Sequence, residues 1–257
     1  MDRLPIGIIG NDALAVALAS RIASAGHRAV IALGAQPPHL KKTPGIEIAS
    51  TATDVAFECA TVVLAIEDSQ ELRRIVIGTA DKIGIGAEMQ PGSILIDTGA
   101  RPPRETQALF GMVGMRGISY VDAALIGWTE HGPGQDALVL TGGFPDAVNA
   151  AEVTLALFGK VERTGPLGSA HTAAALMGYM EAAHSVAEAE AQSVGRALGL
   201  GHAAMHRVFD RPSVARNVTK LARHTGILRR IAEDRGLNAE VIDFTLRKLA
   251  SDAAKTG

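Results

Sequence analysis

The chain has 257 residues, 47% of them hydrophobic and 4% aromatic, and its formal net charge at pH 7 is -2. This length permits one large domain or two smaller ones, and the small net charge argues against nucleic acid or an anionic membrane as a partner. A single cysteine, Cys59, excludes an internal disulfide framework.

The N-terminal end leads directly into a predicted strand, so we expect no signal peptide. No uninterrupted apolar run approaches the roughly 20 residues that are needed to cross a bilayer. We therefore expect a soluble, cytoplasmic protein whose ligand is a small molecule.

Strand-length apolar runs alternate with helical patterns through the first two-thirds of the chain. The predicted strands are 5–9, 29–33, 45–49, 61–66, 93–97, 118–123, 137–142 and 160–163. The predicted helices are 13–25, 55–59, 69–77, 103–115 and 147–157. Such alternation covers both faces of a mainly parallel sheet with helices. The sequence therefore predicts a Rossmann-like, doubly wound α/β domain over residues 1–165.

The turn after the first predicted strand has the outline of a dinucleotide-binding turn. The pattern G-x-G-x-x-G places its glycines on Gly10, Asp12 and Ala15, so only the first glycine is present. The second glycine normally lets the backbone approach a pyrophosphate, and the third lets the helix pack close to the strand. Asp12 instead puts a carboxylate where phosphate charges would lie on a helix N-terminus.

Asp12 has two interpretations. As the N-cap of the helix 13–25, its side chain accepts backbone N–H bonds, with or without a nucleotide present. Alternatively, the carboxylate repels a pyrophosphate or pairs with a cationic ligand. Repulsion in a partly buried site would weaken phosphate binding by ~1–3 kcal/mol.

The composition changes after Gly168. Residues 169–198 contain no proline and only two glycines, Gly178 and Gly195, which predicts one helix of about 30 residues, ~45 Å long. Further helical patterns cover 202–209, 214–235 and 239–253. We therefore expect a long interdomain helix followed by a small all-α domain, together residues 166–257.

Six segments stand in order along the chain: I-G-I-I-G-N-D-A-L-A at 6–15, G-H at 26–27, D-T-G-A-R-P-P at 97–103, D-A-A-L-I-G-W at 122–128 with G-G at 142–143, G-P-L-G-S-A at 165–170 and L-G-L at 198–200. Together they resemble motifs of the β-hydroxyacid dehydrogenase superfamily, which includes 3-hydroxyisobutyrate dehydrogenase, 6-phosphogluconate dehydrogenase and the imine reductases. The resemblance implies the two-domain fold, NAD or NADP as cofactor, and a homodimer formed through the long helix and the C-terminal domain.

By this resemblance a cofactor would contact the first turn, the ends of two later strands and a cation of the terminal domain. These residues are Gly10, Asn11, Asp12, Ala13, Leu14, Ile66, Thr98 and Arg223. Residues 32–35, after the second strand, offer neither an acid for a ribose hydroxyl nor an arginine for a 2′-phosphate. Arg223 keeps the positive charge of the family's cofactor-facing lysine, whereas His224 replaces the acid that follows it.

The catalytic positions of the family mostly differ in this chain. The lysine falls on Ala174, the asparagine one turn later on Gly178, and the carboxylate-binding serine on Ile126. Glu181 keeps the position of the glutamate that is the general acid of 6-phosphogluconate dehydrogenase. The base is thus lost and the acid present. The residues of the implied substrate pocket are Asp122, Ile126, Gly127, Trp128, Ala174 and Gly178.

Without the lysine, a proton donor must come from elsewhere, and the candidates are Glu181, His171, Tyr179 and His131. Trp128, the only tryptophan, either narrows the mouth of the cleft or packs between the domains. We expect no metal, although Glu181 and His184 have the Glu-x-x-His spacing of helical ligands, because metal sites need further convergent ligands. His202 and His206 are most simply exposed polar residues.

Two hypotheses remain. The first is an NAD(P)-dependent oxidoreductase with altered chemistry, which reduces a less polar carbonyl or imine and does not oxidise ordinary β-hydroxyacids. The second is a non-catalytic relative that keeps the dehydrogenase fold as a ligand-binding or assembly module, because fold alone does not supply function.

Overall fold

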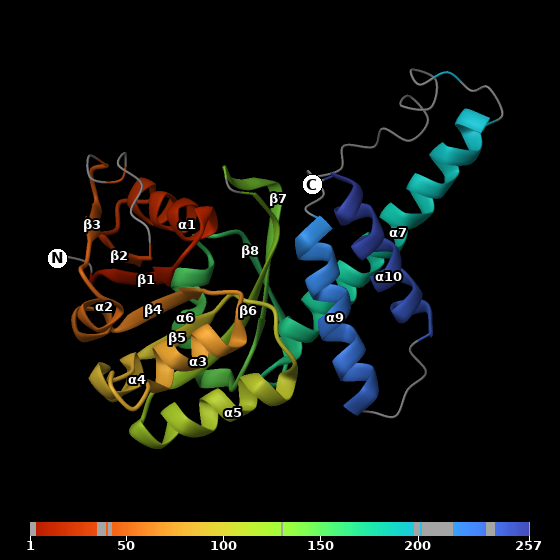
Figure 1. The fold of residues 1–257 in the computed structure, drawn as a ribbon. Coiled ribbons are helices and arrows are strands. Elements are labelled where there is room, and N and C mark those ends of the chain that lie inside the picture. The colour runs from red at the N-terminus through yellow and green to blue at the C-terminus, as the bar shows by residue number, and fades with distance from the viewer. Residues whose placement is uncertain are drawn as a thin grey trace. The chain divides into compact units, whose positions relative to one another are not determined.

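The computed structural model describes residues 4–34, 40, 43–129, 131–197, 201, 218–234 and 240–256. These residues form two compact units, Met1–Ala173 and Ala174–Gly257, which are treated separately below. The first holds the sheet and the second holds helices (Figure 1). The predicted helix over 202–209, with His202 and His206, lies outside the described residues.

The sheet has eight strands in the order β3-β2-β1-β4-β5-β6-β7-β8. The strands are β1 (Ile6–Gly10), β2 (Ala29–Leu33), β3 (Ile46–Ile48), β4 (Thr61–Ala65), β5 (Ile94–Asp97), β6 (Ser119–Thr129), β7 (Gly132–Gly142) and β8 (Lys160–Gly165). The first six strands are parallel. β7 runs antiparallel to β6, and β8 runs parallel to β7. The doubly wound, mainly parallel sheet predicted from the sequence is confirmed.

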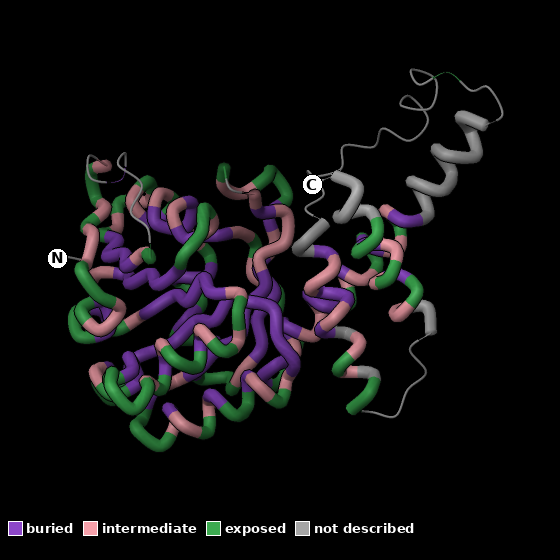
Figure 2. Tube along the Cα trace, in the orientation of Figure 1, coloured by how far each residue is buried: buried purple, intermediate pink, exposed green. Residues whose placement is uncertain are grey.

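Helices cover both faces of the sheet. They are α1 (Ala13–Ser24), α2 (Ala52–Glu58), α3 (Ser69–Ile77), α4 (Ile85–Glu88), α5 (Pro103–Val113) with a 3-10 turn at Gly114–Arg116, and α6 (Pro145–Leu155). One apolar cluster joins α1 and α6 to the sheet, and a second joins α2, α3, α4 and α5 to it. The central strands β1, β4 and β5 are buried almost throughout (Figure 2).

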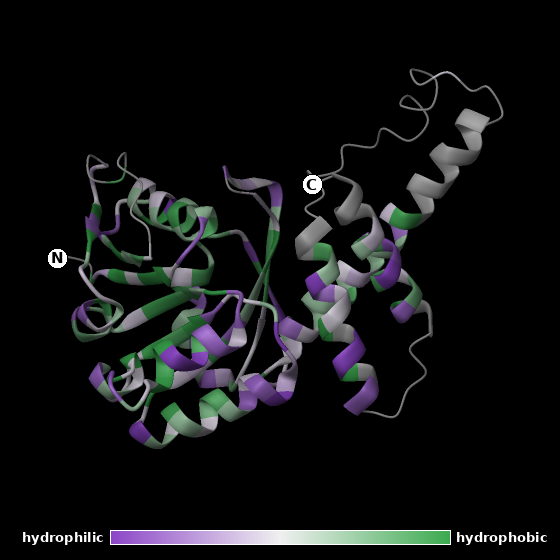
Figure 3. Ribbon diagram, in the orientation of Figure 1, coloured by the Kyte–Doolittle hydropathy of each residue, from purple (hydrophilic) through white to green (hydrophobic). Residues whose placement is uncertain are grey.

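The helical unit contains most of α7 (Ser169–Ala197), together with α9 (Val218–Asp234) and α10 (Glu240–Thr256). Four buried apolar residues from these helices form its small core: Ala182, Val186, Leu221 and Leu249. In the coloured parts of these helices apolar and polar residues are interspersed, as expected of amphipathic helices that bury one face (Figure 3). The long helix predicted over 169–198 is confirmed. Among the described residues, no helix is long and apolar enough to span a membrane.

The structure differs from the sequence-based prediction most at β6 and β7. β6 and β7 form a hairpin and have 11 residues each. The predicted strands 118–123 and 137–142 cover only the inner half of this hairpin, which extends to Thr129 and Gly132. Gly127, with φ of 72°, lies at a shift of register between Ile126 and Trp128. Because glycine adopts this conformation without a steric penalty, the strand continues past the irregularity.

Candidate functional site

The turn between β1 and α1 is closely packed at Gly10. A Cβ atom at this position would lie 2.6 Å from Cβ of Ala15 and 2.9 Å from the carbonyl oxygen of Ala65. Only glycine fits there, so the first glycine of the dinucleotide pattern is retained for a steric reason. Ala15, at the third glycine position, is fully buried in the same contact.

Asp12 is the N-cap of α1. Its backbone is extended and its Oδ1 accepts a hydrogen bond from the amide of Ala15 at 3.2 Å. The N-cap interpretation is confirmed. The carboxylate nevertheless lies at the positive end of the helix dipole, where a bound anion would also lie. In the neighbouring residue Asn11, the side-chain nitrogen Nδ2 donates to Oε2 of Glu71 on α3 at 2.9 Å.

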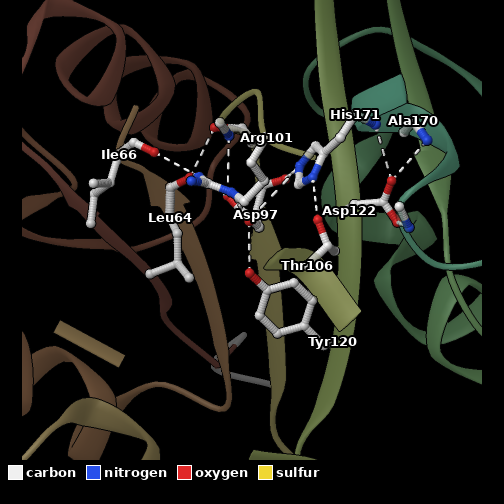
Figure 4. Close-up of polar contacts among 12 residues, drawn as sticks. Leu64, Ile66, Asp97, Arg101, Thr106, Tyr120, Asp122, Ala170 and His171 are labelled. Carbon is white, nitrogen blue, oxygen red and sulfur yellow. Dashed lines mark hydrogen bonds and ion pairs between the residues drawn. The ribbon is translucent and has the colours of Figure 1, made fainter. Parts of the chain in front are cut away.

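A buried ion pair lies at the carboxyl end of β5 (Figure 4). Arg101 and Asp97 are both fully buried. The guanidinium donates to both carboxylate oxygens, at 2.6 Å from Nε and 2.7 Å from Nη2. Nη2 also donates to the carbonyl of Ile66 at 2.8 Å, so Arg101 ties the end of β5 to the end of β4. A two-bond contact of this kind is strong and fixes both groups.

Further donors complete the surroundings of Asp97. The hydroxyl of Tyr120 donates to Oδ2 at 2.7 Å, and the amide of Gly99 donates to Oδ1 at 3.1 Å. Burial alone would raise the pKa of Asp97, but the charges of Arg101 and His171 and the hydrogen bonds of Arg101 and Tyr120 hold it below its usual value. Asp97 is therefore an ionised structural carboxylate.

His171, one of the candidate proton donors, is fully buried beside this pair. Its Nδ1 lies 2.9 Å from the hydroxyl of Thr106, and its Nε2 lies 3.0 Å from the carbonyl oxygen of Asp97. Both ring nitrogens thus have partners within the sheet unit. The environment of His171 favours a structural role over proton donation to a ligand.

Asp122 is also structural in this unit, although it was predicted to line the substrate pocket. It is fully buried, and its carboxylate accepts the amides of Gly168 and Ala170 at 2.7 Å and that of His171 at 3.1 Å. These amides open α7, so a carboxylate from β6 caps the long helix. Figure 4 shows both polar clusters, which share His171.

Trp128 was expected either to narrow the mouth of the cleft or to pack between the domains, and the structure shows instead that it packs inside the sheet unit. It lies in β6, is 7% exposed, and belongs to the core cluster. Its indole nitrogen donates to the carbonyl of Phe158 at 2.8 Å, and its ring meets that of Phe158 edge to face. Its neighbours Ile126 and Gly127 are partly exposed on the same strand.

The remaining residues that the resemblance implied for a cofactor site lie directly after two strands, in α1 and on α9. Ile66 follows β4 and is buried, and Thr98 follows β5 with its hydroxyl donating to the carbonyl of Leu64 at 3.0 Å. Ala13 and Leu14 form the first turn of α1. Arg223 is partly exposed on α9.

The predicted proton donors other than His171 are at least partly exposed. His131 lies in the hairpin turn between β6 and β7, where its amide donates to the hydroxyl of Thr129 at 3.2 Å. On α7, Tyr179 is partly exposed and Glu181 is exposed. Glu181 lies beside the buried stripe of that helix, which includes Gly178 and Ala182. The described residues contain no cluster of three or more His, Cys, Asp or Glu able to hold a metal.

Ala174 and Gly178 lie on α7, and both are buried. A Cβ atom on Gly178 would lie 2.4 Å from Cβ and 2.6 Å from Cγ of His224, and would overlap its ring. His224, on α9, is 9% exposed. The imidazole therefore fills the space that a larger side chain at position 178 would occupy.

The sequence analysis did not identify Arg101 as a site residue. It noted His224 only because this histidine replaces an acidic residue of the family. The i, i+4 spacing of Asp97 and Arg101 directly after a buried strand was a usable signal for the first. The second was signalled by Gly178 itself, because an internal helical glycine is unfavourable and usually has a packing or functional reason.

Comparisons with known protein families, sequences and structures all lead to the same group of dehydrogenases. A model of the NAD binding domain of 6-phosphogluconate dehydrogenase matches residues 5–178. L-threonate dehydrogenase from Cupriavidus necator is 28% identical over 209 residues, which cover 79% of this chain and 69% of that enzyme.

Two solved structures share the fold. Mycobacterium tuberculosis 3-hydroxyisobutyrate dehydrogenase with L-serine has a TM-score of 0.81 at 16% identity, and covers 98% of this chain and 94% of its own. An imine reductase from Myxococcus stipitatus in complex with NADP+ has a TM-score of 0.72 at 16% identity, and covers 98% and 95%. Since the domain model spans more than half of the sequence, this chain belongs to the family that carries the NAD binding domain of 6-phosphogluconate dehydrogenase.

Proposed function

We propose that the protein is an NAD(P)-dependent reductase of a carbonyl or imine that is less polar than the β-hydroxyacid substrates of its relatives. The observation that carries the proposal is the pair of replacements on α7. Ala174, at the position of the family's lysine, is 7% exposed and has no group that takes a proton. Gly178, one turn later, has no side chain, and His224 fills its space.

The turn at Gly10 fits a dinucleotide in its backbone. A Cβ would fill the close approach of β1, β4 and α1, so the tight turn of a nucleotide cradle is preserved. The amides of Ala13 and Leu14 open α1 and would face the pyrophosphate. When bound, the nicotinamide cofactor supplies a hydride. The residues at the ends of β4 and β5, Ile66 and Thr98, would hold its nicotinamide end.

The choice between NAD and NADP belongs to the same proposal. β2 ends at Leu33, and neither this residue nor Gly34 is the acid or arginine that usually selects the cofactor. The imine reductase that shares the fold was solved with NADP+. On the likeness to that structure we favour NADP.

Replacing Asp12 with asparagine should raise the affinity for NADPH by on the order of fivefold to tenfold, since removal of a carboxylate near two phosphates gains about 1 kcal/mol. Asparagine caps helices as well as aspartate does, so thermal stability should stay the same. Calorimetric titration of both proteins measures the change. Asp12→Gly is the comparison, because it removes charge and cap together. Equal affinities of wild type and Asp12→Asn would mean that the carboxylate does not face the phosphates.

We also propose a homodimer that includes the helical unit. Leu176 and Met180 on α7 and Phe244 on α10 are exposed apolar side chains, at 47%, 68% and 46%. A second copy that covers them would enlarge the small helical core. Light scattering on a dilution series tests this, and a monomer at every concentration would contradict it.

The alternative is a ligand-binding module without catalysis. It is favoured by the carboxylate of Asp12 at the phosphate position. Titration with NADPH and NADH, followed by a turnover assay with a small cyclic imine such as methylpyrroline, separates the two functions. Binding with consumption of NADPH supports the reductase, and binding without turnover of any carbonyl or imine tested supports the module.

A further inference from the structure

The ladder between β4 and β5 ends at the pair Leu64 and Asp97. Thr98 prolongs it by one step, because its amide and its hydroxyl both donate to the carbonyl of Leu64 at 3.0 Å. Beyond Thr98 the two segments leave the sheet, one toward α3 and the other toward α5. In an open α/β sheet a ligand binds outside the carboxyl ends of the strands, so whatever holds these two segments together bears on a cofactor site there.

Arg101 joins the two segments past that point (Figure 4). Besides its two bonds to Asp97, its guanidinium donates from Nη2 to the carbonyl of Ile66 at 2.8 Å and from Nη1 to the hydroxyl of Ser69 at 3.3 Å. Ser69 is the first residue of α3. A Cβ atom on Gly99 would overlap both Nη2 of Arg101 and the carbonyl oxygen of Ile66. Gly99 thus leaves room for the guanidinium between the two segments.

Stability alone is a weak explanation for this arginine. A buried ion pair loses the hydration of both charges, and replacing a whole pair by apolar residues is often neutral. Asp97 also has other donors, the hydroxyl of Tyr120 and the amide of Gly99. Burial alone would lower the pKa of Arg101, but the charge of Asp97 and the hydrogen bonds to it hold this pKa above its usual value, so the guanidinium stays charged. What the guanidinium adds, and what no apolar side chain would supply, is the bridge from the end of β5 to the segment after β4.

We propose that Arg101 is a positioning residue for the nicotinamide end of the cofactor. This inference rests on the proposed function, in which Ile66 and Thr98 hold that end. Arg101 is fully buried, so it would act through the backbone, by fixing the segment that carries Ile66 against the segment that carries Thr98. Every contact in this argument lies within the sheet unit. The pyrophosphate would lie at the turn after β1 instead, so the arginine should matter for the nicotinamide end alone.

The binding of two ligands tests the proposal without any turnover. NADPH carries the nicotinamide, and 2′-phospho-ADP-ribose is the same molecule without it. In the double variant Asp97→Asn with Arg101→Met both buried charges are gone, so the fold regains stability that Arg101→Met alone loses, but the bridge to Ile66 is still missing. Its affinity for NADPH should fall by on the order of tenfold, while its affinity for 2′-phospho-ADP-ribose stays within about twofold of the wild-type value. Calorimetric titration measures both affinities.

Two further variants separate positioning from stability. Tyr120→Phe removes a donor to Asp97 but leaves the bridge to Ile66 in place, so both affinities should stay within about twofold of the wild-type values. Arg101→Lys keeps a positive charge beside Asp97, but a single ammonium group does not reproduce the fork that reaches Asp97 and Ile66 together. Its loss of NADPH affinity should therefore match that of the double variant, which it replaces in the comparison if that protein does not fold.

The outcomes separate this inference from the proposed function. A loss of affinity confined to NADPH, in Arg101→Lys and in the double variant, supports the positioning role. Unchanged NADPH affinity in these variants, an equal loss for both ligands, or an equal loss in Tyr120→Phe would overturn it. If the wild type and its variants bind in the expected way but the wild type reduces no carbonyl or imine, the reductase proposal fails and the assignment of Arg101 stands. If the wild type binds no NADPH, both fail.

Discussion

Replacing Arg101 with methionine should lower the free energy of unfolding at pH 7 by about 3–5 kcal/mol, because it leaves the carboxylate of Asp97 buried without its counter-charge. Asp97 and Arg101 are both fully buried, and the guanidinium also ties β5 to the carbonyl of Ile66. Methionine fills a similar apolar volume, so the loss measures the broken pair more than a cavity. Denaturant unfolding followed by circular dichroism gives the difference.

The same variant should have an altered dependence on pH. In the wild type the pKa of Asp97 lies below its ordinary value, so its ionisation stabilises the fold above about pH 4, the pKa of an unfolded aspartate. This contribution is lost as the pH falls through the lowered pKa. Without Arg101, burial raises the pKa of Asp97, and protonation relieves the buried charge. The deficit of Arg101→Met should therefore shrink as the pH falls from 7 toward about 4.

A double variant, Asp97→Asn with Arg101→Met, is the matched control. With both charges removed, part of the lost free energy of unfolding should return at pH 7. The recovery should be incomplete, because Tyr120 and Gly99 then donate to the amide oxygen of asparagine, a weaker acceptor than a carboxylate. A single variant as stable as the wild type at pH 7 would show that the ion pair does not hold the end of β5 to β4.

The wild type should oxidise simple β-hydroxyacids such as 3-hydroxyisobutyrate 10²–10⁴-fold more slowly than an enzyme with a working base, since general acid–base catalysis contributes about that factor. Removal of the hydroxyl proton needs a base in contact with the substrate oxygen, and the methyl group of Ala174 is not one. The half-buried Ile126 also replaces a polar contact to the carboxylate. The rate of this oxidation is measured as the formation of NADH from NAD+ or of NADPH from NADP+.

Ala174→Lys together with Gly178→Asn and His224→Asp is the corresponding gain-of-function variant, because it restores three family residues. It should oxidise β-hydroxyacids faster than the wild type and lose reductase turnover. The wild type oxidising such an acid robustly would refute the altered chemistry, and would show that another base replaces the lysine.

The sheet and the long helix were predictable because their signals are local. Apolar runs of strand length indicate strands, and the absence of proline from 169–198 indicates a long helix. Both signals depend only on residues that are close in the sequence. α4 was not predicted, because four residues are too few for a helical period. The outer half of β6 was missed because Gly127 interrupts the alternation, while pairing with β7 continues past it.

The site was less predictable because its contacts join distant parts of the chain. His171 and its partner Thr106 are separated by 65 residues, and Asp122 lies 46 residues before Gly168, whose amide it accepts. A sequence pattern shows that an ionisable residue is present. It does not show whether the side chain of that residue is already hydrogen-bonded to the backbone of a strand or of a helix N-terminus. His171, Asp122 and Trp128 therefore have structural contacts although the resemblance implied roles at a pocket.

The central claim, that this chain retains a working nicotinamide cofactor site, is tested most directly by a fluorescence titration of NADPH and NADH with the wild-type protein. Trp128 is buried against Phe158, so the emission of the reduced nicotinamide is the better reporter. We predict saturable binding of one NADPH per chain, tighter than that of NADH and strengthened in Asp12→Asn. No saturable binding of either cofactor, by the wild type or by Asp12→Asn, would contradict the claim.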